Sequence, residues 1–175
     1  MAEIGLRPVR DDDLDTIFDQ MRDPEAVRMA AFTAEDPNDR AEFDAHMHRI
    51  RTAPDVNLRA VTVDGELAGT IASFAVGDDT EITYWLDRAW WGRGIATAAV
   101  NLLLDSIPVR PITARAASDN AGSLAVLRKA GFRKVGTEVA YATGRGHEIE
   151  ETVLRLDASE AAAGEPGGRA EPALT

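Results

Sequence analysis

The stretch Trp90-Trp91-Gly92-Arg93-Gly94-Ile95-Ala96-Thr97 constrains the fold of this chain more than any other. A short apolar run at residues 82–86 precedes it, and a helix-like run at residues 98–104 follows it. The pattern therefore predicts a strand, a glycine turn and a helix. At such a junction the first backbone N–H groups lack partners inside the helix, and glycines let a ligand approach closely. This predicts an anion site, most often one for phosphate, with an ordinary turn as the alternative.

Length and composition narrow the class of protein. The 175 residues suggest one domain, and 45% of them are apolar, which is typical of a globular body. No uninterrupted apolar stretch is long enough to span a membrane and no signal peptide is visible, so we expect a cytoplasmic protein. The sequence contains no cysteine, which excludes disulfides, cysteine nucleophiles and thiolate metal sites. A net charge of −11 argues against nucleic-acid binding and would suit a cationic partner.

The first half of the chain predicts a strand, then helices, then a meander. Residues 4–9 form the strand, and the helices begin at the acidic residues 11–13 and at about residue 39. In the later helix Phe43, Met47 and Ile50 share one face, and we expect His46 and His48 beside it to be surface residues. Three antiparallel strands are expected at residues 58–63, 67–76 and 80–87.

The second half contains another bounded helix. The helix after the glycine turn is expected to reach about Ser106, and a strand follows at residues 112–117. Asn120 fits an N-cap and Gly131 fits the residue after a helix end, so the run between them predicts a short helix. Two final strands are expected at residues 133–143 and 147–156. We therefore predict a domain at residues 1–157 and a flexible tail rich in Ala, Gly, Pro and Glu at residues 158–175.

Two motifs in this order resemble the GNAT superfamily of N-acetyltransferases, and within it the RimJ/RimL-like branch that acetylates ribosomal-protein N-termini. The first motif is Tyr84-Trp85-Leu86 with the glycine turn, and the second runs from Asn120-Ala121-Gly122-Ser123 to Gly131-Phe132. The resemblance covers about residues 4–156. It implies a mixed α/β (α+β) fold, in which four or five helices flank a central, mostly antiparallel sheet of six to seven strands. That sheet would splay at an acetyl-CoA site.

The resemblance also implies a donor, acetyl-CoA, and where it binds. Its pyrophosphate would lie on the backbone amides of Gly92, Arg93, Gly94, Ile95, Ala96 and Thr97. Its pantetheine arm would bond to the backbone of Tyr84, Trp85 and Leu86, whose rings we expect in the core. Trp91 departs from the superfamily signature, which has Gln or Arg there. The side chain of Arg93 either contacts a phosphate or is exposed to solvent.

The chemistry implied is direct attack of a neutral primary amine on the thioester in a ternary complex, with no metal. Asn120 would lie near the pantetheine amide or thioester, and Ser123 near the sulfur, where it would protonate the leaving thiolate. A backbone N–H at the splay would stabilise the oxyanion. The alternative is that Asn120 and Ser123 only cap the helix.

The general base and the acceptor are less constrained. Glu81 is the best placed base by sequence, although a solvated strand residue is an equal alternative. The other candidates that we weighed are Asp36, His46, His147, Glu148 and Glu150. The resemblance places the acceptor cleft between the segment 32–51 and the hairpin turn at residues 144–147. The region around these segments carries charges of both signs, so the sequence does not decide whether the acceptor is a protein N-terminus or a small-molecule amine. The sequence also leaves open whether the protein forms a homodimer.

Two other classes of protein were weighed against this enzyme. A dinucleotide-binding fold would need a third glycine where Thr97 stands, and a triphosphate-binding loop would need a Gly-Lys-Ser/Thr ending that is absent. A relative that binds coenzyme A as a sensor or scaffold, without catalysis, is the stronger alternative. The presence of both Asn120 and Ser123 argues mildly against it.

Overall fold

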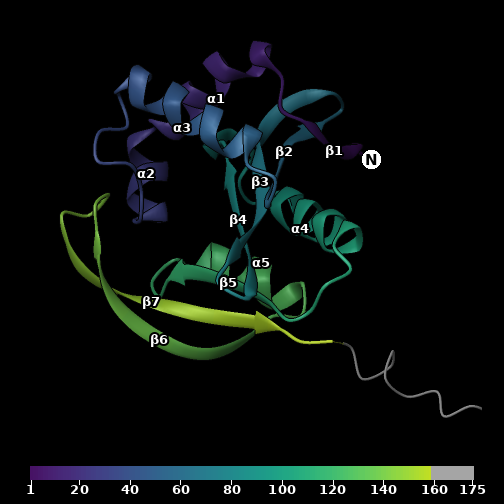
Figure 1. The fold of residues 1–175 in the computed structure, drawn as a ribbon, viewed down its shortest axis with the longest axis vertical. Helices are drawn as coiled ribbons and strands as arrows, with labels where there is room; N and C mark the ends of the chain where they lie inside the picture. The colour runs from purple at the N-terminus through teal and green to yellow at the C-terminus, as the bar shows by residue number, and fades with distance from the viewer. Residues whose placement is uncertain (159–175) are drawn as a thin grey trace, which may run out of the picture.

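A computed structural model describes residues 1–158 and contains one sheet of seven strands in the order β1-β2-β3-β4-β5-β7-β6 (Figure 1). All neighbours pair antiparallel except β4 and β5, which are parallel. The strands are β1 (Ile4–Pro8), β2 (Val56–Val63), β3 (Glu66–Val76), β4 (Asp79–Leu86), β5 (Ile112–Ala117), β6 (Arg133–Ala142) and β7 (His147–Leu156). The helices are α1 (Leu14–Met21), α2 (Pro24–Ala30), α3 (Arg40–Thr52), α4 (Ile95–Ser106) and α5 (Ala121–Lys129). The predicted fold class is confirmed.

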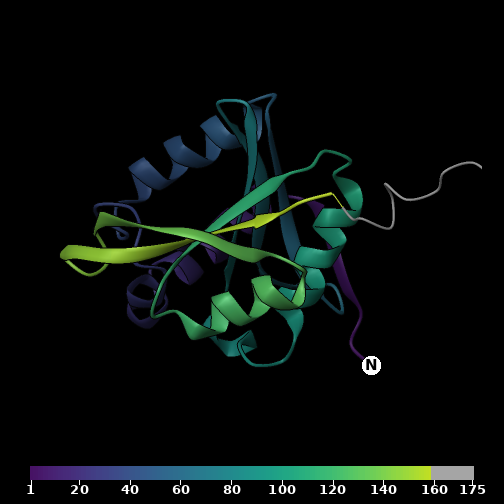
Figure 2. The ribbon, with the colours of Figure 1, turned by 90° about the horizontal axis from the view of Figure 1, so that it is seen from below.

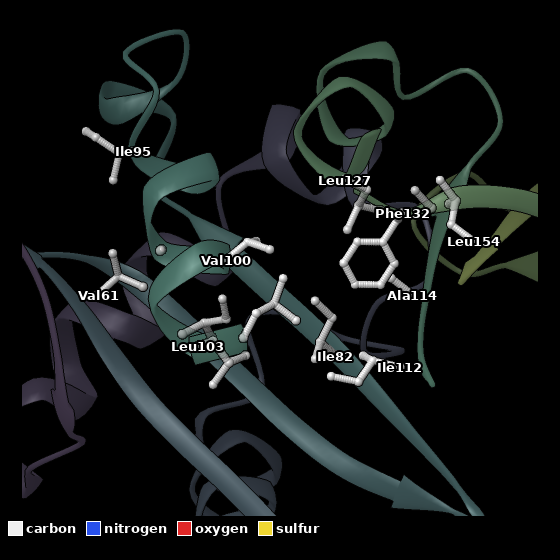
Figure 3. Packing of buried hydrophobic residues seen from close by; sticks show 14 of the residues in the cluster. Val61, Ile82, Ile95, Val100, Leu103, Ile112, Ala114, Leu127, Phe132 and Leu154 are labelled. Atoms are coloured by element: carbon white, nitrogen blue, oxygen red, sulfur yellow. The ribbon is translucent and has the colours of Figure 1, made fainter. Parts of the chain in front are cut away.

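The larger core lies between the sheet and helices α4 and α5. Helix α4 buries Ile95, Ala99 and Leu103, which recur every four residues and therefore share one face. They belong to one buried cluster that also contains Ile82 of β4, Ile112 of β5 and residues of the other elements (Figure 3). Burial of this face fixes the position of α4, and hence of its N-terminus, relative to β4.

The opposite face of the sheet carries α1, α2 and α3 (Figures 1 and 2). A second buried cluster there joins Ile17 of α1 and Met47 of α3 to Ala60 of β2, with Phe43 and Ile50 packed against it. The predicted apolar face of α3 is thus directed at β2. Two features near these helices differ from expectation: the acidic residues 11–13 form a 3₁₀ turn before α1, and β2 begins at Val56.

The sheet opens between its two parallel strands. Strands β4 and β5 pair only at Thr80–Ile112, Glu81–Thr113 and Ile82–Ala114, whereas β4 stays paired with β3 as far as Leu86. Beyond Ile82, one edge of β4 therefore has no strand beside it. The splay predicted at this strand is confirmed.

Two further expectations concern the chain as a whole. Among residues 1–158, no helix is long and apolar enough to cross a membrane. Of the tail predicted from Ala158 onward, only Ala158 falls within the described residues, so the boundary at residue 157 stays a prediction.

Candidate active site

A cavity of about 610 Å³ occupies the splay between β4 and β5. Its lining comes from both faces of the sheet: the turn at residues 92–97 and α5 on one face, and α2 with Phe32 and Phe74 on the other. The unpaired segment of β4, residues 83–86, runs along it. The cavity therefore connects the two faces through the gap in the sheet.

The glycine turn forms the end of the cavity at α4. Gly94 is the N-cap of α4 with φ 76° and ψ 6°, and Gly92 also has a positive φ of 74°. The first helical hydrogen bond runs from Ala98 N–H to the Gly94 carbonyl, so the amides of residues 95–97 have no partner in the helix. With the dipole of α4 behind them, these amides form a positive concave surface suited to a phosphate.

The two large side chains of this turn have structural contacts. Trp91 donates its indole N–H to the Leu86 carbonyl at 2.9 Å, which ties the turn to the end of β4. Arg93 is exposed and lies over the Trp90 ring, with its guanidinium carbon 5.2 Å from the ring centre. Of the residues predicted to bind the donor, Arg93 alone does not line the cavity.

A pair of hydroxyl groups lies where β4 faces α5. The Tyr84 hydroxyl and Ser123 Oγ are 2.6 Å apart, and both residues line the cavity. The Tyr84 ring packs against the core as expected, and burial raises the pKa of its hydroxyl although the bond to Ser123 opposes this. The pair is therefore neutral near pH 7 and can pass a proton.

Asn120 joins three elements. Its Oδ1 accepts from Ser123 N–H at 3.1 Å, which confirms the predicted N-cap, and its Nδ2 donates to the Met29 carbonyl of α2 at 3.2 Å. Asn120 lines the cavity, but both polar groups of its side chain already have protein partners. A contact with the pantetheine arm therefore stays a prediction.

A cluster of charged side chains lines the cavity on the other face of the sheet. Arg115 of β5 lies between Glu81 of β4 and Glu151 of β7, with N–O distances of 3.4 Å and 3.7 Å. The two carboxylate side chains are only 15% and 13% exposed. Arg115 also donates to Glu138 of β6 at 2.6 Å. Arg115 thus pairs with three carboxylates, and the cluster as a whole carries a net negative charge.

Burial raises the pKa of Glu81 and of Glu151 above the ordinary glutamate value. The Arg115 guanidinium opposes this shift, and the neighbouring carboxylate Glu138 adds to it. A carboxylate with a raised pKa is a stronger base than a solvated one. The cluster can accordingly bind an ammonium group or accept its proton.

The other predicted bases lie elsewhere. Five exposed residues are outside the cavity lining: Asp36, His46, His147, Glu148 and Glu150. Of the segment 32–51 expected at the acceptor cleft, only Phe32 lines the cavity, and α2 lines it in place of α3. Helix α3 packs instead against β2 through Met47. The hairpin turn at residues 144–147 does not line the cavity but contacts α2.

Sequence reasoning missed Glu151, Arg115 and the hydroxyl of Tyr84. Arg115 interrupts the small residues of an otherwise buried strand, and a charged residue there signals a partner. Glu151 had no comparable signal, because β7 contains three glutamates and only its register shows which one faces Arg115. In that register Glu151 pairs with Ala117, two residues along the strand from Arg115, so the two share a face.

The arrangement agrees with a known family. A sequence model described as "Acetyltransferase (GNAT) domain" matches residues 3–133. The chain belongs to the GNAT acetyltransferase family. The probable N-acetyltransferase YjcK of Bacillus subtilis is 38% identical over 81 residues, which cover 42% of this chain and 45% of YjcK. The match thus spans less than half of that protein.

Solved GNAT structures share the fold. RimJ of Mycobacterium smegmatis, in complex with CoA-disulfide, is 25% identical with a TM-score of 0.76, covering 90% of this chain and 83% of RimJ. Spermidine N-acetyltransferase of Vibrio cholerae, in complex with CoA and spermine, has a TM-score of 0.76 at 16% identity, covering 88% of this chain and 95% of that one. The family and its RimJ/RimL-like branch, predicted from two motifs, are confirmed.

Proposed function

We propose that this GNAT protein transfers an acetyl group from acetyl-CoA to a primary amine that is cationic in solution, by direct attack in a ternary complex. The observation that carries the proposal is one cavity through the splay, with free helix amides at one end and half-buried carboxylates at the other. Donor and acceptor would enter from opposite faces of the sheet and meet beside β4.

The donor would bind mainly through backbone groups. The amides of residues 95–97 fit the pyrophosphate, and the unpaired edge of β4 at residues 83–86 offers N–H and carbonyl groups to the pantetheine amides. Lys129, which lines the cavity at the end of α5, supplies a positive charge for a phosphate. Backbone recognition also explains why Trp91 can replace the Gln or Arg of the signature.

The carboxylates would prepare the amine. An ammonium group is attracted to the Glu81–Arg115–Glu151 cluster because its carboxylates outnumber the one guanidinium. Glu81, on the strand that runs to the splay, would take the proton, either directly or through one water. The neutral nitrogen then attacks the thioester carbon, and the C–S bond breaks when the tetrahedral intermediate collapses.

The leaving thiolate would take its proton from the hydroxyl pair. Ser123 Oγ donates to the sulfur, and the Tyr84 hydroxyl, 2.6 Å away, donates in turn to Ser123. A thiolate is a good leaving group, so this step needs only modest help. As the intermediate collapses, the nitrogen loses its second proton to water. The protein ends with a proton on Glu81 and one missing from Tyr84, and exchange with solvent restores both, so that each turnover releases one proton.

A thiol-release assay with acetyl-CoA tests the proposal. The acceptors are peptides with free N-termini, amino acids, polyamines and aminoglycosides, each paired with its N-acetylated form as the matched control. We expect thiol release with at least one free amine and none with its acetylated form. Calorimetry with coenzyme A runs in parallel. Binding of coenzyme A without turnover of any amine would favour the sensor or scaffold alternative. Failure to bind coenzyme A would contradict both that alternative and the proposed enzyme.

A further inference from the structure

Helix α2 forms one wall of the cavity. Two of its last carbonyls, and the carbonyl of the residue that follows it, are each bonded to a different group. Ala26, Met29 and Ala30 of this seven-residue helix line the cavity, as does Phe32 just beyond it. The chain leaves the helix through Ala31, which has a φ of 66° and is fully buried. A non-glycine residue holds that conformation only when its surroundings fix it.

Arg145, in the turn between β6 and β7, provides the strongest of these contacts. Its Nε donates to the Arg28 carbonyl of α2 at 2.6 Å. Its Nη1 and Nη2 pair with the two carboxylate oxygens of Asp119 at 2.7 Å and 2.8 Å. The Arg145 side chain is 11% exposed, and its guanidinium lowers the pKa of Asp119. A two-pronged ion pair of this kind fixes direction as well as distance.

Two more contacts complete the attachment. Gly144 N–H donates to the Ala31 carbonyl at 2.7 Å, and Asn120 Nδ2 donates to the Met29 carbonyl. A Cβ on Gly144 would lie 2.6 Å from the Val27 carbonyl oxygen, so the turn and α2 touch backbone to backbone. In Figure 1 the tip of the β6–β7 hairpin accordingly curls back toward α2.

The position of Asp119 connects these contacts to the other side of the cavity. Asp119 directly precedes Asn120, the N-cap of α5, and α5 carries Ser123. Arg145 thus ties the wall on the acceptor side to the start of the helix on the donor side. Neither Arg145 nor Asp119 lines the cavity, so both can act only through the elements that they join.

We propose that Arg145 is a positioning residue, which holds the α2 wall at a fixed distance from α5 and thereby sets the affinity for the acceptor amine but not for acetyl-CoA. The proposal rests on the proposed function. Loosening α2 widens the acceptor side, whereas the donor amides belong to α4, which the large core holds in place.

Arg145→Gln is the direct test, and Arg133→Gln is its matched control, because Arg133 makes an exposed ion pair with Asp157 in the same hairpin. Asp119→Asn is a milder second variant at an exposed carboxylate. For Arg145→Gln we expect the KM of the amine to rise at least about tenfold, with kcat and the Kd of coenzyme A changed less than about twofold. Asp119→Asn should give a smaller rise in the same KM, and Arg133→Gln none.

Hydrogen exchange of the peptide covering residues 24–32 supplies a readout that needs no turnover. Faster exchange in Arg145→Gln than in Arg133→Gln is expected. Unchanged exchange, or an equal rise in the KM of the amine and of acetyl-CoA, would overturn the positioning role. A wild-type protein that turns over no amine would instead overturn the proposed function, and this proposal with it.

Gly144→Ala approaches the same contact sterically. Its added methyl should push α2 away from the hairpin, whereas Gly136→Ala, in β6, meets no atom within 4 Å. We expect Gly144→Ala alone to raise the KM of the amine. An equal effect of both variants would show that the hairpin as a whole, and not its contact with α2, matters.

Discussion

The two ends of the cavity are built in different ways. The end proposed for the donor, here called the donor end, has backbone amides from one continuous stretch, residues 92–97, at the start of a helix. The end proposed for the amine, here called the acceptor end, has side chains from three strands, Glu81, Arg115 and Glu151, together with the separate helix α2. The local conformation of one segment is sufficient to form the donor end. The acceptor end forms only when the registers of the strands bring residues together that are distant in the sequence.

This difference implies different sensitivities to mutation. A backbone site fails when the chain cannot adopt its local conformation, and most side-chain changes leave it intact. A side-chain site is sensitive to single charges, because each carboxylate and the guanidinium shift the others. Changes at the donor end should therefore alter binding of coenzyme A, and changes at the acceptor end should alter turnover, KM of the amine and pH dependence.

The largest effect is expected from Gly94→Val. The residue has a φ of 76°, so a branched side chain there costs about 1–2 kcal/mol of strain. Its bulk would also occupy the space in front of the helix amides. We expect the Kd of coenzyme A, measured by calorimetry, to rise by roughly 100-fold or more.

Gly77→Val is the control for that variant, because Gly77 has a φ of 60° in the turn between β3 and β4, outside the cavity. It should lose similar stability in thermal unfolding and keep its affinity for coenzyme A. Equal losses of affinity in the two variants would mean that strain, and not the amide surface, explains the result.

The next largest effect is expected from Glu81→Gln, and the quantity that it changes is the turnover number kcat. Removing the base is expected to lower kcat about 100-fold, while the Kd of coenzyme A stays within about twofold. Glu151→Gln should lower kcat less. Glu138→Gln is the control, because Glu138 also bonds Arg115 but is 59% exposed and outside the cavity. If Glu151→Gln proved the more damaging variant, the base would be Glu151.

Ser123→Ala is expected to lower kcat by about tenfold to 100-fold without weakening coenzyme A binding. Tyr84→Phe should have a smaller effect, because it removes only the second hydroxyl of the pair. Ser106→Ala, at the far end of α4, is a matched control. Full activity of Ser123→Ala under single-turnover conditions would show that Ser123 has only a structural role in the capped helix.

The smallest change is a shift in pH dependence in Arg115→Gln. Arg115 lowers the pKa of both Glu81 and Glu151, so its removal should raise the pKa of each. A base works only when deprotonated, and the acidic limb of the kcat/KM profile should therefore move to higher pH. If the acidic limb stays in place or moves to lower pH, the general base is not a member of this cluster.

Much of the fold was predictable because its signals are local. The cap at Asn120, the glycine turn before α4 and the apolar face of α3 follow from short patterns, and predicted strand ends fall within two residues of the observed ones. The donor residues were predictable for the same reason, and all except Arg93 line the cavity. Their roles toward acetyl-CoA stay predictions.

The acceptor end was predictable only in part. Glu81 was identified because it lies on the strand that leads to the turn, but Glu151 could not be told apart from the other glutamates of β7. The segment 32–51 was expected to line the acceptor cleft, but of this segment only Phe32 lines the cavity. Helix α3 packs its apolar face against β2, and α2 lines the cavity instead. Local periodicity shows that a helix has an apolar face but does not show what that face covers.

The sequence by itself determined the glycine turn, the capped helix α5 and the family that these imply, because helix caps and turns depend on neighbouring residues. The tertiary structure alone decided that Arg115 lies between Glu81 and Glu151, and that Arg145 joins α2 to the start of α5. These contacts link residues up to 117 positions apart. They arise from strand order and register, which the packing of the whole sheet determines.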